Sequence, residues 1–285
     1  MEKIIYIPKV LPDSPKTYNI LADLQYDIIN CIEDNIILDF SNCQFSHAIF
    51  TSFIGALAVL AKSRQKKLTY RAKKDSKLYR YIMTSGLYSF LTADNQNHTN
   101  RYSIPFTEIK MNEDSVIDYT NNILNLAPIK LTEKAEELLF INIYELFINA
   151  YDHSKAMNGV YACGNWMPKK QELVFSVYDT GIGIPSLVKD KVDSSLSSKD
   201  AVLWSLASGN STKQLIKNIP RGIGLPNFKN FIEVNNGYFS IVSNDICYIY
   251  NNNERFYTIQ HPIVGTIISF IIRSDDKHIY TVKQK

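Results

Sequence analysis

The N-terminal third of the chain alternates between strand-like and helix-like segments, and this alternation limits the fold more than any other feature. Three apolar runs have the length and composition of short buried strands: residues 4–7, 35–40 and 67–72. Three segments between and after them have the apolar spacing of helices: residues 14–33, 49–63 and 76–84. A repeated strand–helix order is typical of an α/β domain, so we expect one over residues 1–95.

A polar stretch separates this unit from a second one. Residues 96–115 contain one proline and little periodicity, which favours a linker. Within residues 116–285 helical spacing returns at 118–126 and 132–151, and Thr132 precedes the second helix as a candidate N-cap. Further elements are expected as a helix at 226–234 and strands at 173–178, 238–242, 246–250 and 266–272. The second unit is thus predicted to be an α/β sandwich, a mixed sheet with helices on one face.

The composition narrows the class of protein. Of 285 residues, 45% are hydrophobic and 21% charged, which is typical of a globular protein with a substantial core. The formal net charge of +3 does not support a nucleic-acid partner. No apolar run approaches the roughly 18–20 residues of a membrane-spanning helix. The start, MEKIIYIPKV, predicts a strand and not a signal peptide, and the four cysteines form no C-x-x-C pair. We therefore expect a cytoplasmic protein with core cysteines and no membrane partner.

The first candidate chemical group lies on the helix predicted at 132–151. Glu145 and Asn149 are four residues apart, which places both on one helical face, and His153 follows at the helix end. An amide oxygen can ligate Mg²⁺, and a carboxylate can take a proton from water. Taken alone, the pair also fits an ordinary solvated helix face.

A second group follows the strand predicted at 173–178. Asp179 ends that strand, and Gly181 and Gly183 come directly after it. A carboxylate there can accept a hydrogen bond from an exocyclic amine, and the glycines let the backbone approach a flat ring. Taken alone, this motif also fits a plain turn. Neither a G-x-G-x-x-G dinucleotide fingerprint nor a G-x-x-x-x-G-K-[ST] phosphate loop occurs in the chain.

Two further glycine motifs lie near the C-terminus. Gly222 and Gly224 precede the helix at 226–234, and the free amides of a helix N-terminus can hold phosphate oxygens. Gly265 and Thr266 open a late strand, from which the hydroxyl can reach a base-binding aspartate. A turn or a β-bulge is the alternative for the second pair.

The order of these four motifs resembles the GHKL ATP-binding superfamily, which includes gyrase, heat-shock chaperones, histidine kinases and mismatch-repair ATPases. The resemblance covers about residues 115–275. The first motif has the form E-x-x-x-N-A-x-x-H-S, and Ser-Thr-Lys stands shortly before the second glycine motif. These details are most similar to anti-sigma-factor-like serine kinases and related bacterial ATPases. The resemblance implies ATP and Mg²⁺ as cofactors.

The resemblance also implies roles for single residues. Asn149 would ligate Mg²⁺, and Glu145 would orient or deprotonate a water molecule or an acceptor hydroxyl. Asp179 would bind the adenine amino group with support from Thr266. His153 either supports this pocket or packs at the helix end.

The glycines and a polar segment would complete the pocket. Gly181 and Gly183 would line the base, and the amides around Gly222 and Gly224 would hold phosphates. Residues 186–220 would form a lid over the nucleotide. Its basic residues are candidates for phosphate contacts: Lys213 first, then Lys199, Lys217 and Arg221.

The N-terminal unit resembles a STAS-like domain, the fold of anti-sigma-factor antagonists. In that family a short Asp-Ser-Ser-Gly-type turn carries a phosphorylated serine, whereas the matching region here reads SHAIFTSFIGA. Ser46, Thr51 and Ser52 are the alternative acceptors, but the missing motif favours a structural or docking role. His47 lies on no two-helix hairpin, which argues against a histidine-kinase phosphoacceptor.

Two functions remain open for the whole chain. The first is a Mg-ATP-binding regulator with ATPase or serine/threonine protein kinase activity, acting on a STAS-type or operon-encoded protein partner. The second is a non-catalytic ATP-gated switch, which needs only different affinities in its two states. Glu145 favours turnover, because a pure binder needs no carboxylate there. The resemblance is compatible with a homodimer, and the missing acceptor helix disfavours a sensor histidine kinase.

Overall fold

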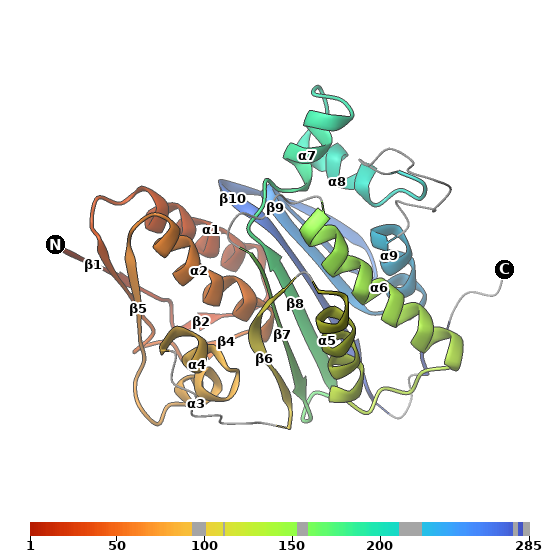
Figure 1. Ribbon diagram of the computed structural model, residues 1–285, viewed down its shortest axis with the longest axis horizontal. Coiled ribbons are helices and arrows are strands. Elements are labelled where there is room, and N and C mark those ends of the chain that lie inside the picture. The colour runs from red at the N-terminus through yellow and green to blue at the C-terminus, as the bar shows by residue number, and fades with distance from the viewer. Residues whose placement is uncertain (93–100, 111, 153–158, 211–223, 276–278, 282–285) are drawn as a thin grey trace.

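The computed structural model describes residues 1–92, 101–110, 112–152, 159–210, 224–275 and 279–281. These residues form a layered α/β structure in which a small parallel sheet, a pair of helices, a larger sheet and a second group of helices follow one another (Figure 1). None of the described helices is long and apolar enough to cross a membrane. The layers of helices and sheets confirm the predicted α/β class.

The N-terminal unit has the predicted alternation of strands and helices. Its parallel sheet has the strand order β1-β3-β5. Ser14 caps the first helix, because its side chain accepts a hydrogen bond from the backbone of Thr17. The elements are β1 (Glu2–Tyr6), β2 (Val10–Leu11), α1 (Pro15–Asn30), β3 (Asn35–Asp39), β4 (Phe45–Ser46), η1 (Ala48–Phe50), α2 (Thr51–Ser63), β5 (Lys67–Arg71), α3 (Lys77–Thr84) and α4 (Leu87–Thr92).

The larger sheet has five strands in the order β6-β7-β8-β10-β9. Every neighbouring pair is antiparallel, so the prediction of a mixed sheet was wrong. The reason is the connectivity: β7 to β8 and β9 to β10 are joined by short turns, which only antiparallel neighbours allow. The strands are β6 (Ser103–Ile109), β7 (Val160–Met167), β8 (Glu172–Asp179), β9 (Tyr238–Asn251) and β10 (Glu254–Arg273).

The segment predicted as a linker, 96–115, contains β6 and the start of the next helix. Ile104, Phe106 and Ile109 of this strand are buried, and Pro105 is tolerated because β6 lies at the sheet edge. The strand pairs with β7 through a register shift between Ile104 and Thr107. The second unit therefore starts in the middle of the predicted linker.

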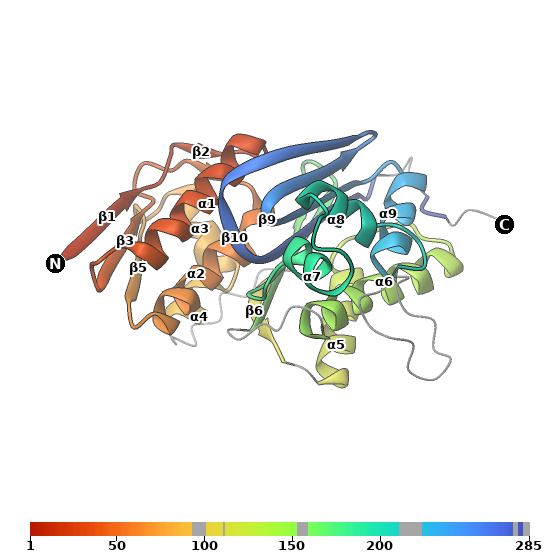
Figure 2. The same ribbon diagram turned by 90° about the horizontal axis from the view of Figure 1, so that it is seen from above.

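The helices of the second unit are α5 (Glu113–Leu126), α6 (Glu133–Asp152), α7 (Ile184–Lys191), α8 (Ser198–Ser205) and α9 (Gly224–Val234). Thr132 caps α6 as predicted, since its hydroxyl accepts a hydrogen bond from the backbone of Ala135. Helices α5, α6 and α9 cover one face of the five-stranded sheet. Helices α1 and α2 cover the opposite face, as the view from above shows (Figure 2). Helices thus lie on both faces of this sheet.

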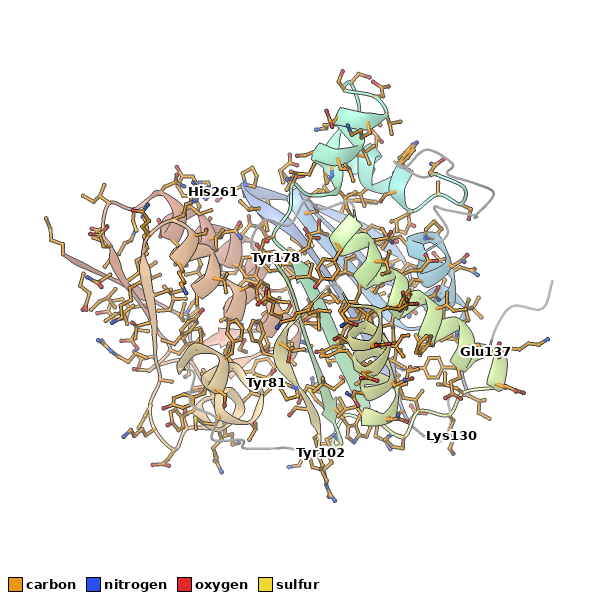
Figure 3. The ribbon with its side chains drawn as sticks, in the orientation of Figure 1. Tyr81, Tyr102, Lys130, Glu137, Tyr178 and His261 are labelled. Atoms are coloured by element: carbon orange, nitrogen blue, oxygen red, sulfur yellow. The ribbon has the colours of Figure 1, made fainter. Side chains whose placement is uncertain are left out.

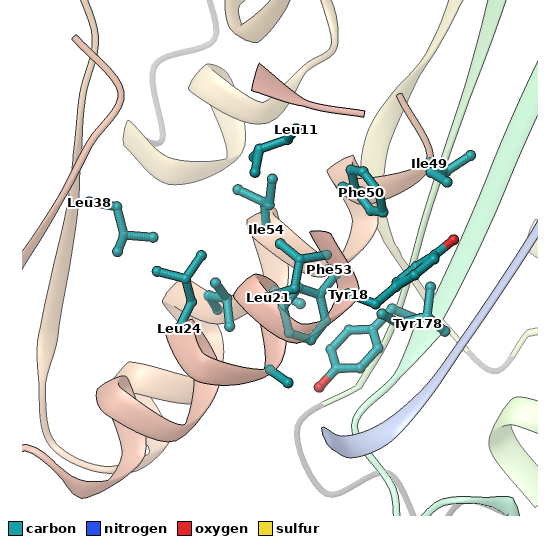
Figure 4. Close-up of a cluster of buried hydrophobic side chains, with 14 of the residues drawn as sticks. Leu11, Tyr18, Leu21, Leu24, Leu38, Ile49, Phe50, Phe53, Ile54 and Tyr178 are labelled. Carbon is teal, nitrogen blue, oxygen red and sulfur yellow. The ribbon is translucent and has the colours of Figure 1, made fainter. Parts of the chain in front are cut away.

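Strand β8 shows how the two covered faces arise from an uninterrupted apolar run. Leu173, Phe175 and Val177 belong to the core under α5, α6 and α9. Val174 and Tyr178 belong to the core under α1 and α2, because successive side chains of a strand point to opposite faces. The ring of Tyr178 lies 5.1 Å from that of Phe53 and points into the cluster of buried residues on α1 and α2 (Figure 4). The two units therefore share one hydrophobic core.

Candidate functional site

Asp179, Gly181 and Gly183 of the predicted site lie where β8 ends and α7 begins. Figure 3 labels Tyr178 at this end of the sheet, next to Asp179 in the chain. The C-terminal part of α6 packs on β8, and α9 packs on α6. Motifs that are far apart in the sequence are thus collected at one end of the five-stranded sheet.

Asp179 is the last residue of β8 and is only 6% exposed. Its Oδ1 accepts a hydrogen bond of 2.9 Å from the backbone of Gly181. Burial raises the pKa of this carboxyl group to about 7, although hydrogen bonds from Gly181 and Thr266 act in the opposite direction. A buried carboxylate with so perturbed a pKa is a frequent feature of binding sites, because a ligand donor can satisfy it.

Thr266 stands opposite Asp179 in the antiparallel register of β8 and β10. Its Oγ1 lies 2.9 Å from the Oγ of Ser243, and the pair connects β10 to β9. The preceding Gly265 has a φ of +88°, and a Cβ there would lie 1.9 Å from the backbone oxygen of Asp179. The close approach of β10 to Asp179 therefore requires glycine at position 265.

Replacing Gly265 by alanine should lower the free energy of unfolding by about 2–4 kcal/mol, because left-handed backbone strain adds to overpacking. Chemical denaturation measures this loss. Gly209→Ala is the matched control, since Gly209 has a similar φ of +86° but no atom within 4 Å of an added Cβ. Equal losses in both variants would show that the contact with Asp179 has no energetic importance.

The loop after Asp179 is held by two residues that the sequence analysis did not identify, Ser243 and Asn244 of β9. The Oγ of Ser243 accepts a hydrogen bond of 2.9 Å from the backbone of Ile184. The side chain of Asn244 donates to the oxygen of Ile182 and accepts from the backbone of Ser186. The signal in the sequence was the run of three polar residues, 243–245, that interrupts an apolar strand, because a polar group buried in a strand usually has a specific partner.

Gly183 also lies against the side chain of Asn244. It has a φ of +85°, and a Cβ there would lie 2.5 Å from the Oδ1 of Asn244. Gly181 is buried and donates its backbone hydrogen to Asp179. Gly183 thus allows a close backbone approach to β9, and Gly181 supplies a backbone donor to the aspartate.

Glu145 and Asn149 lie against the first residue of α9. A Cβ at Gly224 would lie 2.3 Å from Oε2 of Glu145 and 3.1 Å from Nδ2 of Asn149. Both side chains are partly buried, and burial raises the pKa of the Glu145 carboxyl group. Glu145 and Asn149 of α6 are therefore in direct contact with the start of α9.

Several predicted residues lie outside the described part of the chain. They are His153, Lys213, Lys217, Arg221 and Gly222. Lys199 is described, and its ammonium group lies over the ring of Phe256 at 5.0 Å. It makes this contact instead of facing the cluster around Asp179.

The described part of the predicted lid is more ordered than its polar sequence indicated. It contains α7 and α8, and Ala201 and Val202 of α8 are buried. Val202 and Leu206 pack into the core of the second unit. This part of the segment is therefore attached to the sheet through apolar contacts.

The candidate phosphoacceptors of the N-terminal unit are mostly covered. Ser52 is fully buried and donates a hydrogen bond of 2.9 Å to the hydroxyl of Ser176 on β8. The Thr51 hydroxyl lies 2.7 Å from that of Tyr81, and His47 is buried with a lowered pKa. Ser46 is half-buried. The contacts of Thr51 and Ser52 are those of structural residues.

Among the described residues, no group of three or more His, Cys, Asp or Glu side chains forms a metal cluster. This does not conflict with Mg²⁺ at Asn149, because Mg²⁺ commonly takes one or two protein oxygens and completes its shell with phosphates and water. Of the four cysteines, Cys43, Cys163 and Cys247 are buried and Cys31 is half-buried, so they have the core positions that the sequence predicted.

A surface groove of about 430 Å³ lies elsewhere, between α5 and α6. It is lined by Asn121, Leu124, Glu136, Glu137, Phe140 and Ile141. The groove uses the N-terminal part of α6 and includes none of the predicted site residues.

No protein-family model matches the chain, and no curated protein matches its sequence. The functional argument therefore depends on the residues of the site.

Proposed function

We propose that this chain binds Mg-ATP at the end of the five-stranded sheet and hydrolyses it or transfers its terminal phosphoryl group. In this proposal the second unit is a GHKL-type ATP-binding domain and the N-terminal unit is a STAS-like domain. The observation that carries the proposal is that residues of separate motifs contact one another. Glu145 and Asn149 contact Gly224, and Asp179 pairs with Thr266, although these residues come from four separate motifs.

The base would be recognised at Asp179. Its buried carboxylate accepts hydrogen bonds, and the exocyclic amine of adenine is a donor of the right kind. Backbone at Gly181 and Gly183 would lie along the ring, and Ser243 and Asn244 would keep this loop in place. Guanine presents an oxygen where adenine presents the amine, so the same carboxylate would discriminate against it.

The phosphates would lie between α6 and α9. Asn149 offers an amide oxygen for Mg²⁺, which would neutralise phosphate charge. Helix α9 begins at Gly224, and the free N–H groups of its first turn favour anions. Glu145 lies at the same contact, where its carboxylate would accept a proton from water or from an acceptor hydroxyl. Its raised pKa strengthens it as a base.

A non-catalytic ATP-gated switch is the alternative function. The hydrophobic core that the N-terminal unit shares with the five-stranded sheet favours the switch. Through this core, a conformational change at the nucleotide site would also affect the N-terminal unit. A regulatory protein partner of STAS type would bind in either case.

Titration calorimetry of the purified chain with Mg-ATP tests the proposal. We expect binding that weakens when Mg²⁺ is removed. A chain that binds no adenine nucleotide would contradict the proposal as a whole. Incubation with γ-labelled ATP, with and without operon-encoded proteins, then separates the activities. Label on a partner serine or threonine indicates a kinase, free phosphate alone indicates an ATPase, and neither indicates the switch.

A further inference from the structure

Strand β10 leaves the ladder of β9 just before it reaches the proposed site. Between Thr258 and Thr266 the described strands keep only the pair Ile263–Asn244, with a register shift on each side. Backbone N–H groups in such a bulge lose their strand partners. They must be satisfied in another way, because an unpaired buried N–H group is costly.

Helix α1 of the N-terminal unit supplies partners for this bulge. The Oδ1 of Asn19 accepts a hydrogen bond of 3.0 Å from the backbone of Gln260. The Oε1 of Gln25 accepts one of 2.6 Å from the backbone of Val264. Two side chains of α1 therefore replace part of the missing ladder.

Gln25 also uses the other half of its carboxamide. Its Nε2 donates a hydrogen bond of 2.9 Å to the hydroxyl of Tyr178, which donates one of 2.7 Å to the oxygen of Val264. Gln25 is 1% exposed and Tyr178 is fully buried. The three groups form a closed set of hydrogen bonds, in which the bond between Gln25 and Tyr178 is buried and the two bonds to Val264 are partly buried. The loss of a buried hydrogen bond is costly.

The hydrogen bonds among Gln25, Tyr178 and Val264 lie next to residues of the proposed site. Tyr178 immediately precedes Asp179, and Val264 immediately precedes Gly265 and Thr266. The pair Asp179–Thr266 is the last rung between β8 and β10, so the ladder does not fix the two strands beyond it. Gln25 connects Val264, which lies beyond that rung, to Tyr178, which lies within the ladder opposite Ile267. Figure 3 shows Tyr178 at the end of the sheet that faces α1.

We propose that Gln25 is a positioning residue of the nucleotide site, through which the N-terminal unit sets the affinity and base preference of Asp179 and Thr266. The inference rests on the proposed function. Gln25 acts on the pocket indirectly, through its hydrogen bonds to Tyr178 and Val264. The N-terminal unit is then a structural component of the adenine pocket and not only a partner-binding module.

Replacing Gln25 by methionine tests this inference, since the side chain keeps its size and loses both hydrogen bonds. We expect the dissociation constant for Mg-ATP to rise about tenfold, because a site that holds its binding geometry only about a tenth of the time binds about tenfold more weakly. We also expect the preference for ATP over GTP to fall, because Asp179 and Thr266 are held less firmly. Calorimetry with both nucleotides measures the two effects on the full chain.

Asn19→Leu is the matched control. It removes the other carboxamide that α1 offers to the same bulge, at Gln260, which is farther along the chain from Gly265. We expect a lowered melting temperature but nucleotide affinity within about twofold of the wild type. Equal losses of affinity and preference in both variants would overturn the inference, since they would reflect the general stability of the interface.

The failure of this inference differs from the failure of the proposed function. If the wild type binds no adenine nucleotide, the proposed function fails and this inference with it. If the wild type binds and folded Gln25→Met keeps its affinity and base preference, only the inference fails. In case Gln25→Met does not fold, Tyr178→Phe takes its place, because it removes the hydroxyl through which Gln25 and Val264 are connected to β8. Wild-type affinity and preference in that variant would contradict the inference.

Discussion

Replacing Asp179 by asparagine is expected to weaken Mg-ATP binding by roughly 10- to 100-fold and, at the same time, to stabilise the nucleotide-free protein at neutral pH. The first effect follows because a hydrogen bond from the adenine amine to an ionised acceptor contributes about 1.5–3 kcal/mol. Asparagine keeps an oxygen for the backbone of Gly181 but removes the charge. Calorimetry at pH 8, where the wild-type carboxyl group is mostly ionised, measures this loss.

The stabilising effect follows from the pKa of Asp179. Folding raises this pKa from 3.8 to about 7, so between these pH values the folded protein holds a proton that the unfolded chain has released. The free energy of unfolding of the wild type therefore falls as the pH rises from about 4 to 7 and then levels off. Each pKa unit corresponds to about 1.4 kcal/mol. Asp179→Asn lacks this dependence, so its advantage in stability should appear at pH 8 and vanish near pH 4.

Urea denaturation of both proteins across this pH range measures the stability difference. Asp190→Asn is a suitable control, because Asp190 is an exposed acid of α7 close to the same loop. It should change neither stability nor affinity appreciably. A variant at position 179 that is less stable than the wild type at pH 8 would show that the carboxylate is satisfied in the free protein. It would then be a structural residue and a poor candidate for binding a base.

The parts of the fold that the sequence predicted are those with a strong local pattern. Helix α6 has a threonine cap followed by a long apolar stripe, and β8 is an apolar run ended by Asp179. Such patterns require no knowledge of distant partners. The order of the motifs implied one common pocket, but the contact of Glu145 and Asn149 with Gly224 could be found only in the structure.

The missed parts depend on partners that a single sequence does not reveal. Strand β6 is short, contains a proline and stands in a mostly polar stretch, so its pairing with β7 is not apparent from the sequence. Only residues 266–272 of strand β10 were predicted, because Pro262 and Gly265 interrupt its apolar pattern, whereas α1 supports the strand there. Gln25 is one of several polar residues of α1, and nothing local distinguishes it from a solvated side chain. Its role became visible only when α1 was placed beside the sheet.

The second large effect is expected at Glu145. Replacing it by glutamine should lower ATP hydrolysis or phosphoryl transfer by ~10²–10⁴-fold, the usual range for loss of a general base. Nucleotide affinity should change little, since glutamine has the same shape and keeps the contact with Gly224. Steady-state turnover and calorimetric affinity, measured on the same preparation, separate the two quantities.

The control for this experiment lies on the same helix. Glu137 is exposed near the other end of α6 (Figure 3), so Glu137→Gln makes the same chemical change away from the proposed site. It should leave turnover unchanged. If Glu145→Gln also turns over at the wild-type rate, Glu145 is not the base, and the carboxylate beside Gly224 has a structural role. If neither the wild type nor Glu145→Gln turns over ATP while both bind Mg-ATP, the contact between α6 and α9 serves nucleotide binding alone. The ATP-gated switch is then the function of the chain.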